Sequence, residues 1–151
     1  MNRKIEFRGK NHQGRWCFGS LIVDGEFTTI KRKISVLGPD NYAGVPIKND
    51  YYWESYHVDP ETVGQFTGLK DSNRCDIFEG DILKCRIKKF EHIPYVVGYR
   101  LGLFETRPNN QNLASSPLKY LLNDDEGNTL NSWTIIGNIH DNPELLKGGA
   151  Q

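Results

Sequence analysis

The sequence predicts a mainly β fold, and the prediction rests on its residue composition. Residues that favour extended structure (Ile, Val, Thr, Phe, Tyr and Trp) occupy 43 of the 151 positions, whereas Ala occurs three times and Met once. β-Branched and aromatic side chains fit the half-buried surface of a sheet, while Ala and Met favour helices. Gly (15), Asn (13) and Pro (7) supply many turn positions. We therefore expect short antiparallel strands that form small SH3-like, β-barrel-type lobes, with one short C-terminal helix.

The first of two expected lobes covers residues 1–58. Residues 4–8 alternate apolar and charged side chains, and this period of two is typical of a strand with one buried face. Residues 15–23 and 26–34 flank the dipeptide Asp24-Gly25, which suits a two-residue type I′ turn, so a hairpin is expected there. Residues 51–58 are rich in aromatic side chains and are expected to be extended. Residues 37–50 contain two Gly and two Pro and are expected to be irregular.

The second expected lobe covers residues 59–147 and begins where Asp59-Pro60 interrupts the extended pattern. The pattern predicts a strand at 62–66, a turn at 67–74, a hairpin that pairs 82–90 with 95–100, a loop at 108–116 and a strand at 133–136. Asn142 can act as an N-cap and Pro143 fits the first helical position, which predicts a short helix at 144–147. Residues 148–151 are expected to form a disordered tail.

Charge, hydropathy and cysteine content disfavour several classes of protein. Lys and Arg total 19, as do Asp and Glu, so the net charge is zero and a histone-like protein is not expected. No apolar run approaches the roughly 18 residues of a membrane span, and no signal peptide is apparent, so no membrane association is expected. Cys17, Cys75 and Cys85 form an odd set without a CxxC pair, which is typical of free thiols in a reducing compartment. We expect a cytoplasmic protein.

Zero net charge conceals an alternation of sign along the chain. Residues 1–35 carry a net charge of +5, residues 36–81 of −6, residues 82–107 of +4 and residues 108–151 of −3. Basic segments with aromatic neighbours can bind nucleic acid by neutralising phosphates and stacking on bases. The candidate residues for this role are Arg15, Trp16, Lys31, Arg32, Lys33, Lys88 and Lys89. The alternative is that basic and acidic segments meet within the fold or between subunits and neutralise one another.

The sequence contains no motif for a particular catalytic reaction. It lacks a phosphate-binding P-loop, a GxSxG nucleophile elbow and a GxGxxG dinucleotide motif. Glu79 and Asp81 would share one face of a strand, as an acid–base or Mg²⁺ pair might require, but carboxylates beside a turn more often bond backbone N–H groups. Cys75 and Cys85 lie on neighbouring expected strands, yet a zinc site needs three or four ligands. We expect no enzyme activity, metal or cofactor.

Three segments, in order along the chain, resemble one protein family. Residues 65–73 (QFTGLKDSN) and 77–82 (IFEGDI) are similar to the QYTGLKDKNG and IYEGDIV signature of the YopX family, whose members are encoded mainly by phages and prophages. Residues 5–8 (IEFR) resemble its opening IKFR strand, and residues 136–146 (IGNIHDNPELL) resemble its closing IGNIYENPELL. Cys75 and His140 depart from this pattern. The positions expected to shape the motif are Thr67, Gly68, Asp71, Glu79, Gly80, Asp81, Gly137, Asn138, Asn142 and Pro143.

The resemblance implies a mostly β protein that is cytoplasmic in the host cell and has no established activity. The segment 79–81 is typical of the diverging turn of SH3-like barrels, and a ligand-binding loop is the alternative. Our first hypothesis is a non-catalytic phage or prophage accessory protein that self-associates as a homo-oligomer and contacts an unknown phage or host protein. The alternatives are a nucleic-acid-binding protein that uses the basic segments and, in third place, a small hydrolase-type enzyme that uses Glu79 and Asp81.

Overall fold

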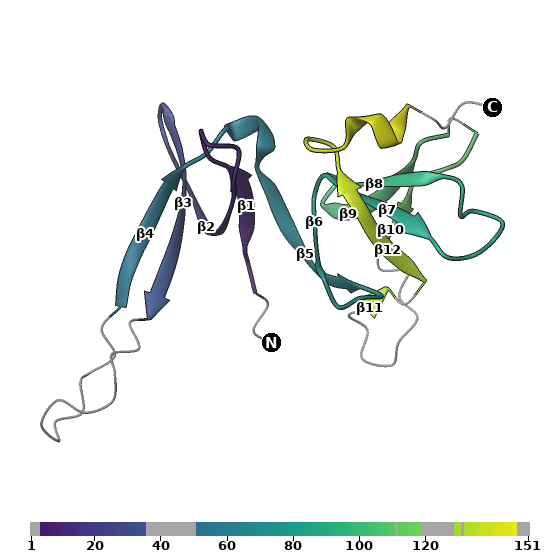
Figure 1. Ribbon diagram of the computed structural model, residues 1–151, viewed down its shortest axis with the longest axis horizontal. Coiled ribbons are helices and arrows are strands. Elements are labelled where there is room, and N and C mark those ends of the chain that lie inside the picture. Colours follow the sequence, from purple (N-terminus) through teal and green to yellow (C-terminus); the bar gives the residue numbers. More distant parts are fainter. Residues whose placement is uncertain (1–3, 36–50, 111, 119–128, 131, 148–151) are drawn as a thin grey trace, which may run out of the picture. The chain divides into compact units, whose positions relative to one another are not determined.

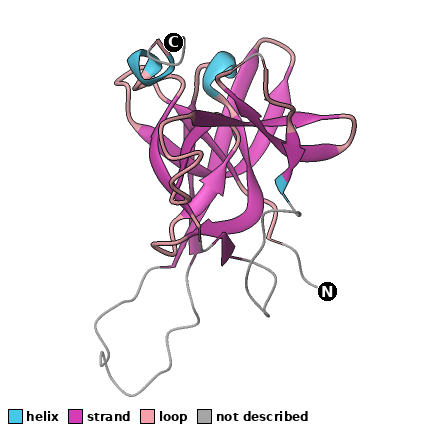
Figure 2. Cartoon of the chain, turned by 90° about the vertical axis from the view of Figure 1, so that its right-hand side faces the viewer, coloured by secondary structure: helices cyan, strands magenta, loops and turns pink. Residues whose placement is uncertain are grey.

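The structure is a computed structural model that describes residues 4–35, 51–110, 112–118, 129–130 and 132–147 (Figure 1). Its contacts divide the chain into two compact units, one of residues 6–63 and one that joins residues 1–5 to residues 64–151. Strands make up most of the regular structure, and the helices of the described residues are short 3-10 turns (Figure 2). The expected mainly β fold with short antiparallel strands is confirmed.

The unit of residues 6–63 is built on an antiparallel sheet with the order β1-β2-β3-β4. These strands are β1 (Phe7–Lys10), β2 (Trp16–Asp24), β3 (Phe27–Ser35) and β4 (Tyr51–His57). One face of the sheet is apolar, with Cys17, Ile30 and Val58 buried and Phe7, Leu21, Tyr56 and Val63 packed against them. The 3-10 turn η1 (Pro60–Thr62) follows β4. The Lys10 backbone N–H donates to Thr62 Oγ1 at 2.8 Å, which ties η1 to this unit, so the unit extends to residue 63 rather than ending at residue 58.

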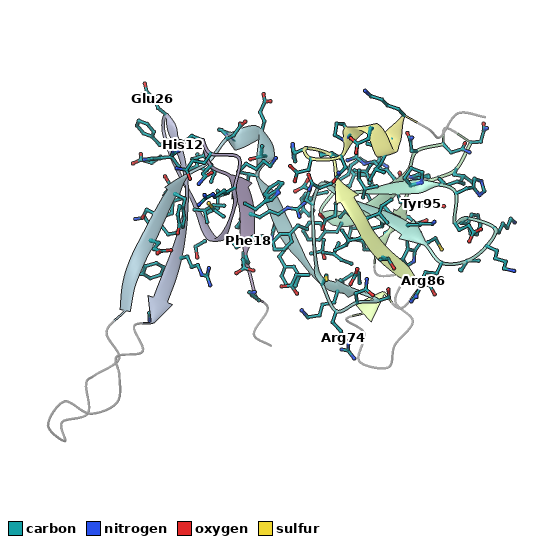
Figure 3. All side chains as sticks on the ribbon, viewed as in Figure 1. His12, Phe18, Glu26, Arg74, Arg86 and Tyr95 are labelled. Atoms are coloured by element: carbon teal, nitrogen blue, oxygen red, sulfur yellow. The ribbon has the colours of Figure 1, made fainter. Side chains whose placement is uncertain are left out.

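The hairpin expected around Asp24-Gly25 is confirmed, but its turn differs from the predicted type. Asp24 pairs with Phe27, so Gly25 and Glu26 form the two-residue loop. A type I′ turn needs a positive φ at both loop residues, whereas Gly25 has a φ of +52° and Glu26 is not among the described residues with a positive φ. Gly at the first loop position, with a positive φ there alone, is the pattern of a type II′ turn. Figure 3 shows Glu26 at the tip of this hairpin.

The second unit contains two groups of strands. In the smaller group, β5 (Gly64–Asp71) pairs with β6 (Asp76–Phe78) in antiparallel fashion and with β11 (Thr129–Leu130) in parallel fashion. The larger sheet has the order β10-β9-β8-β7-β12 and consists of β7 (Asp81–Cys85), β8 (Pro94–Arg100), β9 (Leu103–Pro108), β10 (Ser116–Pro117) and β12 (Trp133–Asn138). The core of this unit consists of Ile77, Leu83, Cys85, Ile93, Tyr95, Val97, Leu118 and Trp133.

Several elements predicted for the second unit are confirmed, but the prediction of a turn at 67–74 is wrong. The predicted pairing of residues 82–90 with 95–100 corresponds to β7 and β8, and the predicted late strand corresponds to β12. Residues 67–71, predicted as a turn, continue β5, because a register shift between Phe66 and Lys70 accommodates the positive φ of Gly68 (+88°) inside the strand. The reversal is confined to the next few residues, where the Asp71 N–H donates to the Cys75 carbonyl at 2.9 Å.

The predicted C-terminal helix is a single 3-10 turn, η3 (Pro143–Leu146). Pro143 begins the turn as predicted, but the prediction that the Asn142 side chain caps it is wrong. Asn142 Oδ1 instead accepts a hydrogen bond from the Asn138 N–H at 3.4 Å, on the side away from the turn. The predicted irregular segment at 37–50 and the tail at 148–151 lie outside the described residues. Barrel-type closure of either lobe stays a prediction.

Candidate nucleic-acid interface

The register of β1 to β4 assigns the side chains of this sheet to two faces. Directly paired residues of an antiparallel sheet point to the same side, and successive residues along a strand alternate. Ile30 is fully buried and pairs with Leu21 and Tyr56, so these three residues mark the apolar face. Lys31 follows Ile30 along β3 and therefore lies on the opposite face.

Four cationic side chains lie on this opposite face, of which Arg8 is buried (8% exposed) and the three lysines are at least partly exposed. Lys31 and Lys33 alternate along β3, and Arg8 and Lys10 alternate along β1. The Arg8 guanidinium carbon is 4.6 Å from the centroid of the Trp16 ring, and Lys10 Nζ is 5.4 Å from the same centroid. Cations over an indole ring are attracted by its negative face, so Arg8 and Lys10 help to orient Trp16.

Exposed aromatic side chains also lie on this face. Phe18, labelled in Figure 3, pairs with Arg8 and is 40% exposed. Trp53 pairs with Lys33 and is 58% exposed. Phe27, beside the hairpin turn, is also 58% exposed. Rings at such positions are accessible to a ligand that stacks on them.

We refer to this surface as the cationic face and define it by Arg8, Lys10, Trp16, Phe18, Lys31, Lys33 and Trp53. Among the strand positions that the structure describes, Asp24 at the end of β2 is the one carboxylate on this face. Glu54 of β4 pairs with Arg32 on the other face and accepts a hydrogen bond from the Tyr56 hydroxyl. That hydrogen bond, with burial and the charge of Glu54, raises the pKa of Tyr56 above its ordinary value. Arg32 therefore lies on the same face as Glu54, whereas Lys31 and Lys33 lie on the other face.

In the second unit, the signature segment around Asp71 forms a buried, hydrogen-bonded turn. Asp71 is 1% exposed, and its Oδ1 accepts hydrogen bonds from the backbone N–H groups of Asn73 (2.8 Å) and Cys75 (2.9 Å). Its Oδ2 accepts a third from the Ile135 N–H at 3.0 Å. Thr67 donates its hydroxyl to a backbone carbonyl of β6 at 2.8 Å. These bonds connect β5, β6 and β12, so both side chains hold strands together.

The signature segment 79–81 forms a second turn in which backbone groups are bonded. Gly80 has a φ of +84°, donates its N–H to a carbonyl of β8 at 2.9 Å and accepts the Ile139 N–H at 2.9 Å. Asp81 is 2% exposed, and its Oδ2 accepts a hydrogen bond from the Phe78 N–H at 2.7 Å. The Asp81 carboxylate thus bonds the backbone of its own turn.

The closing signature segment reverses the chain tightly after β12. A Cβ atom added to Gly137 would lie 2.5 Å from Asn142 Oδ1, so a side chain at this position would force Asn142 to move. Asn138 Oδ1 accepts hydrogen bonds from the N–H groups of His140 (3.0 Å) and Asp141 (2.9 Å). The three signature segments therefore form turns and strand junctions within one unit.

Comparison with known proteins identifies the family of the chain. The model of the YopX protein family matches residues 7–147. The chain belongs to the YopX family. The crystal structure of protein EF1440 from Enterococcus faecalis is similar to this YopX chain, with a TM-score of 0.57 and 23% sequence identity over 96% of this chain and 99% of that one. At this identity the likeness concerns the fold alone. None of the curated proteins matches the chain.

The sequence of the YopX chain predicts one nucleic-acid surface for Lys31, Arg32 and Lys33. The structure places these three residues on two faces of the sheet. Lys31 and Lys33 lie on the cationic face together with Trp16. Arg32 lies between them on β3, and the alternation of the strand turns it to the opposite face, where it pairs with Glu54. Two of the three residues therefore share one face of the sheet.

The remaining predicted candidates lie outside the cationic face. Arg15 precedes β2, and its N–H donates to Asn11 Oδ1 at 3.0 Å. Lys88 and Lys89 belong to the second unit, in the exposed segment between β7 and β8, where Lys89 Nζ is 5.5 Å from the centroid of the Phe90 ring. The cationic face thus does not include them.

The candidate residues predicted from the sequence do not include four members of this surface: Arg8, Lys10, Phe18 and Trp53. Lys10 could have been identified from its spacing, because it lies two residues after Arg8 and so shares its side of a strand. Trp53 could not, because its place opposite Lys33 depends on the register between β3 and β4, whose sequences are separated by residues 36–50.

Neither a metal centre nor a membrane span is found in the part of the chain that the structure describes. Within it, no three His, Cys, Asp or Glu side chains gather as a ligand set. Cys75 is exposed and Cys85 is buried, and both are free thiols. The helices of the described residues are too short and too polar to cross a bilayer.

Proposed function

We propose that this YopX-family protein is a non-catalytic binding protein and that its cationic face binds single-stranded nucleic acid. The observation that carries the proposal is that Lys10, Lys31 and Lys33 share one face of the β1–β4 sheet with the exposed rings of Phe18 and Trp53. Cations neutralise phosphates, and aromatic rings stack on bases that an unpaired strand leaves accessible. The stacking component favours single strands, because a duplex keeps its base faces covered.

Lys33 and Trp53 form the centre of this interface. They are directly paired, so their Cβ atoms are about 4.5–5.5 Å apart. A base stacked on the indole of Trp53 places its own phosphate within reach of the Lys33 ammonium group. Phe18 provides a second ring, beside the Trp16 ring that Arg8 and Lys10 orient. Successive nucleotides of one strand can thus contact successive ring–cation pairs.

Fluorescence anisotropy with labelled oligo-dT and oligo-U of about 15 nucleotides tests the proposal. We expect binding that weakens between about 50 and 200 mM salt, with a log–log slope near −0.7 for each phosphate contacted. Lys33→Ser should lower the affinity and make the slope shallower by about 0.7. Arg32→Ser is the matched control, since it removes the same charge from the adjacent position on the opposite face, and it should change both quantities little.

Replacement of the ring tests the stacking component separately. Trp53→Ala should cost about 1–3 kcal/mol of binding free energy while leaving the salt slope unchanged, because it removes a stacked base and no phosphate contact. Failure of the unmodified protein to bind either oligonucleotide at low salt would reject the proposal. Equal losses from Arg32→Ser and Lys33→Ser would also count against it, since charge alone and not this face would then be responsible.

A second candidate function is self-association as a homo-oligomer, or docking onto an unknown phage or host protein in the cytoplasm. It is favoured by apolar side chains exposed at hairpin ends: Val23 is 67% exposed near the β2–β3 turn, and Leu101 is 88% exposed between β8 and β9. Sedimentation velocity over a hundredfold range of concentration tests self-association. A constant monomer mass would reject it, and a mass that falls on Val23→Ser or Leu101→Ser would support it.

A further inference from the structure

A pocket of about 370 Å³ opens into the core of the second unit, in a part of the chain separate from the cationic face. Its walls come from the segment after β7, the loop before β10 and the strands β8, β9 and β12. The lining residues are Cys85, Ile87, Phe90, Tyr95, Thr106, Leu113, Ala114, Ser116, Ser132 and Trp133. All of these side chains are uncharged, and aromatic and aliphatic groups predominate. Sites for small molecules have volumes of roughly 300–1,000 Å³ and walls of this kind.

Two residues that line this pocket carry side-chain hydrogen-bond donors without partners within the described chain. Tyr95 and Trp133 are 9% and 7% exposed, and their rings meet edge to face with centroids 4.9 Å apart. Neither the Tyr95 hydroxyl nor the Trp133 indole N–H forms a hydrogen bond to any residue that the structure describes. Tyr and Trp that are buried in a core usually bond these groups to protein, so the pair is unusual.

The hydroxyl of Tyr95 remains a donor at neutral pH. Burial, and secondarily the neighbouring Cys85, raise the pKa of Tyr95 above its ordinary value, so the group stays protonated. The Thr106 hydroxyl at the same pocket donates weakly to the Ser116 carbonyl at 3.4 Å. Tyr95 and Trp133 are therefore two uncharged hydrogen-bond donors among the lining residues.

We propose that the Tyr95–Trp133 pocket binds an uncharged, planar heteroaromatic molecule that accepts hydrogen bonds from these two side chains. A flat ring system matches the aromatic walls formed by Phe90 and Trp133. A carbonyl oxygen has two lone pairs and can accept from both donors, whereas the single lone pair of a ring nitrogen is shared by them in a three-centre hydrogen bond. A charged ligand is disfavoured, because a charge enclosed by uncharged walls loses its hydration without compensation.

Quinoline, naphthalene and 2-naphthoate form a probe set that separates these features. Quinoline and naphthalene have the same shape, but only quinoline carries an acceptor nitrogen, and 2-naphthoate adds a charge. In ¹H–¹⁵N spectra of the full chain, we expect quinoline to move the Trp133 indole N–H signal downfield. Naphthalene should bind more weakly and without that downfield shift, and 2-naphthoate should not bind. A Trp133 indole signal that none of the probes moves at millimolar concentration would overturn the proposal.

Three variants test whether the probes bind in this pocket. Tyr95→Phe removes one hydroxyl and should weaken quinoline three- to tenfold, about the worth of one hydrogen bond, with no effect on naphthalene. Tyr99→Phe is the control, because Tyr99 lies on the same strand and is 53% exposed outside the pocket. Ala114→Trp places a large ring at the exposed rim and should block both probes. Unchanged quinoline affinity in both Tyr95→Phe and Ala114→Trp would assign binding elsewhere and overturn the proposal.

Discussion

Individual carboxylates bond the backbone at the turns of the second unit. Removing an ionised carboxylate from water is costly unless hydrogen bonds replace the lost hydration. Asp71 has three such bonds from backbone N–H groups, and Asp81 has one from the Phe78 N–H. Because both groups are almost fully buried, neither is positioned as a free surface acid. At the scale of single residues, the signature of the family thus includes backbone-bonding side chains.

Removal of the Asp71 carboxylate should destabilise the fold strongly. Asp71→Ala leaves three backbone N–H groups without their acceptor, and we expect the free energy of unfolding to fall by about 2–5 kcal/mol. Urea denaturation followed by tryptophan fluorescence measures this change. Asp141→Ala is the control, because Asp141 is exposed and should contribute less than about 1 kcal/mol. Similar losses in the two variants would show that the buried bonds contribute little.

At the scale of elements, close approaches between strands depend on glycine in two different ways. A Cβ atom on Gly64 of β5 would lie 2.5 Å from the backbone carbonyl oxygen of Glu79. A Cβ atom on Gly98 of β8 would lie 2.3 Å from the Arg107 guanidinium. Backbone held in a turn cannot withdraw without moving a strand, whereas the end of an exposed arginine side chain can rotate away. The two contacts are equally short but differ in consequence.

Substitution of each glycine by alanine should separate these cases. Gly64→Ala should lower the free energy of unfolding by about 1–3 kcal/mol, as overpacking in a core does. Gly98→Ala should cost much less, because Arg107 can rotate away from the added methyl group. Thermal denaturation of both variants provides the comparison. If Gly98→Ala proved the more damaging of the two, the argument from backbone rigidity would be wrong.

At the scale of the whole molecule, the two units have cores of unequal size. The described core of the unit of residues 6–63 consists of three buried side chains and four partly buried ones, whereas eight side chains are buried in the core of the second unit. Hydrophobic stabilisation grows with the apolar area removed from water, so the second unit is the more stable by this measure. Each core also contains a titratable group, Cys17 in the first and Tyr95 in the second.

Both units should therefore lose stability in alkali. Burial raises the pKa of Cys17 above its ordinary 9.0 and, with a smaller effect of Cys85, that of Tyr95 above its ordinary 10.0. Above these ordinary values the unfolded chain releases protons that the folded chain retains, so the free energy of unfolding falls as pH rises. Urea titrations between pH 7 and 11 should show a plateau up to about pH 9 and a decline beyond it.

Two variants assign this alkaline decline to its groups. Cys17→Ala should remove the part of the decline that begins near the ordinary thiol pKa. Tyr95→Phe should reduce the part that begins near that of the phenol, to which Tyr56 also contributes. Tyr99→Phe is the control, because Tyr99 is exposed and its replacement should leave the curve unchanged. A decline of the same size and position in all three variants would attribute it to other groups.

Local patterns in the sequence were sufficient to predict some strands and turns and insufficient to predict others. The β2–β3 hairpin was predictable because Asp24-Gly25 lies between two alternating runs, although the turn itself is formed by Gly25 and Glu26. The extension of β5 to Asp71 was not predictable, because Gly68 and Asp71 favour turns locally. Pairing with β6 and the bonds from Asp71 to other segments outweigh that preference.

The sequence by itself determined the mainly β class, the hairpin and the family, because these depend on composition and on residues adjacent in the chain. The tertiary structure alone decided which cations share a face with which rings. In the sequence, one basic cluster is formed by Lys31, Arg32 and Lys33. In the pleated strand, Arg32 lies opposite Glu54 on one face, whereas Lys33 and Lys31 lie opposite Trp53 and Ser55 on the other. The pocket of Tyr95 and Trp133 likewise depends on strands far apart in the chain. Such pairings are fixed by burial and strand register, which are properties of the whole packed sheet.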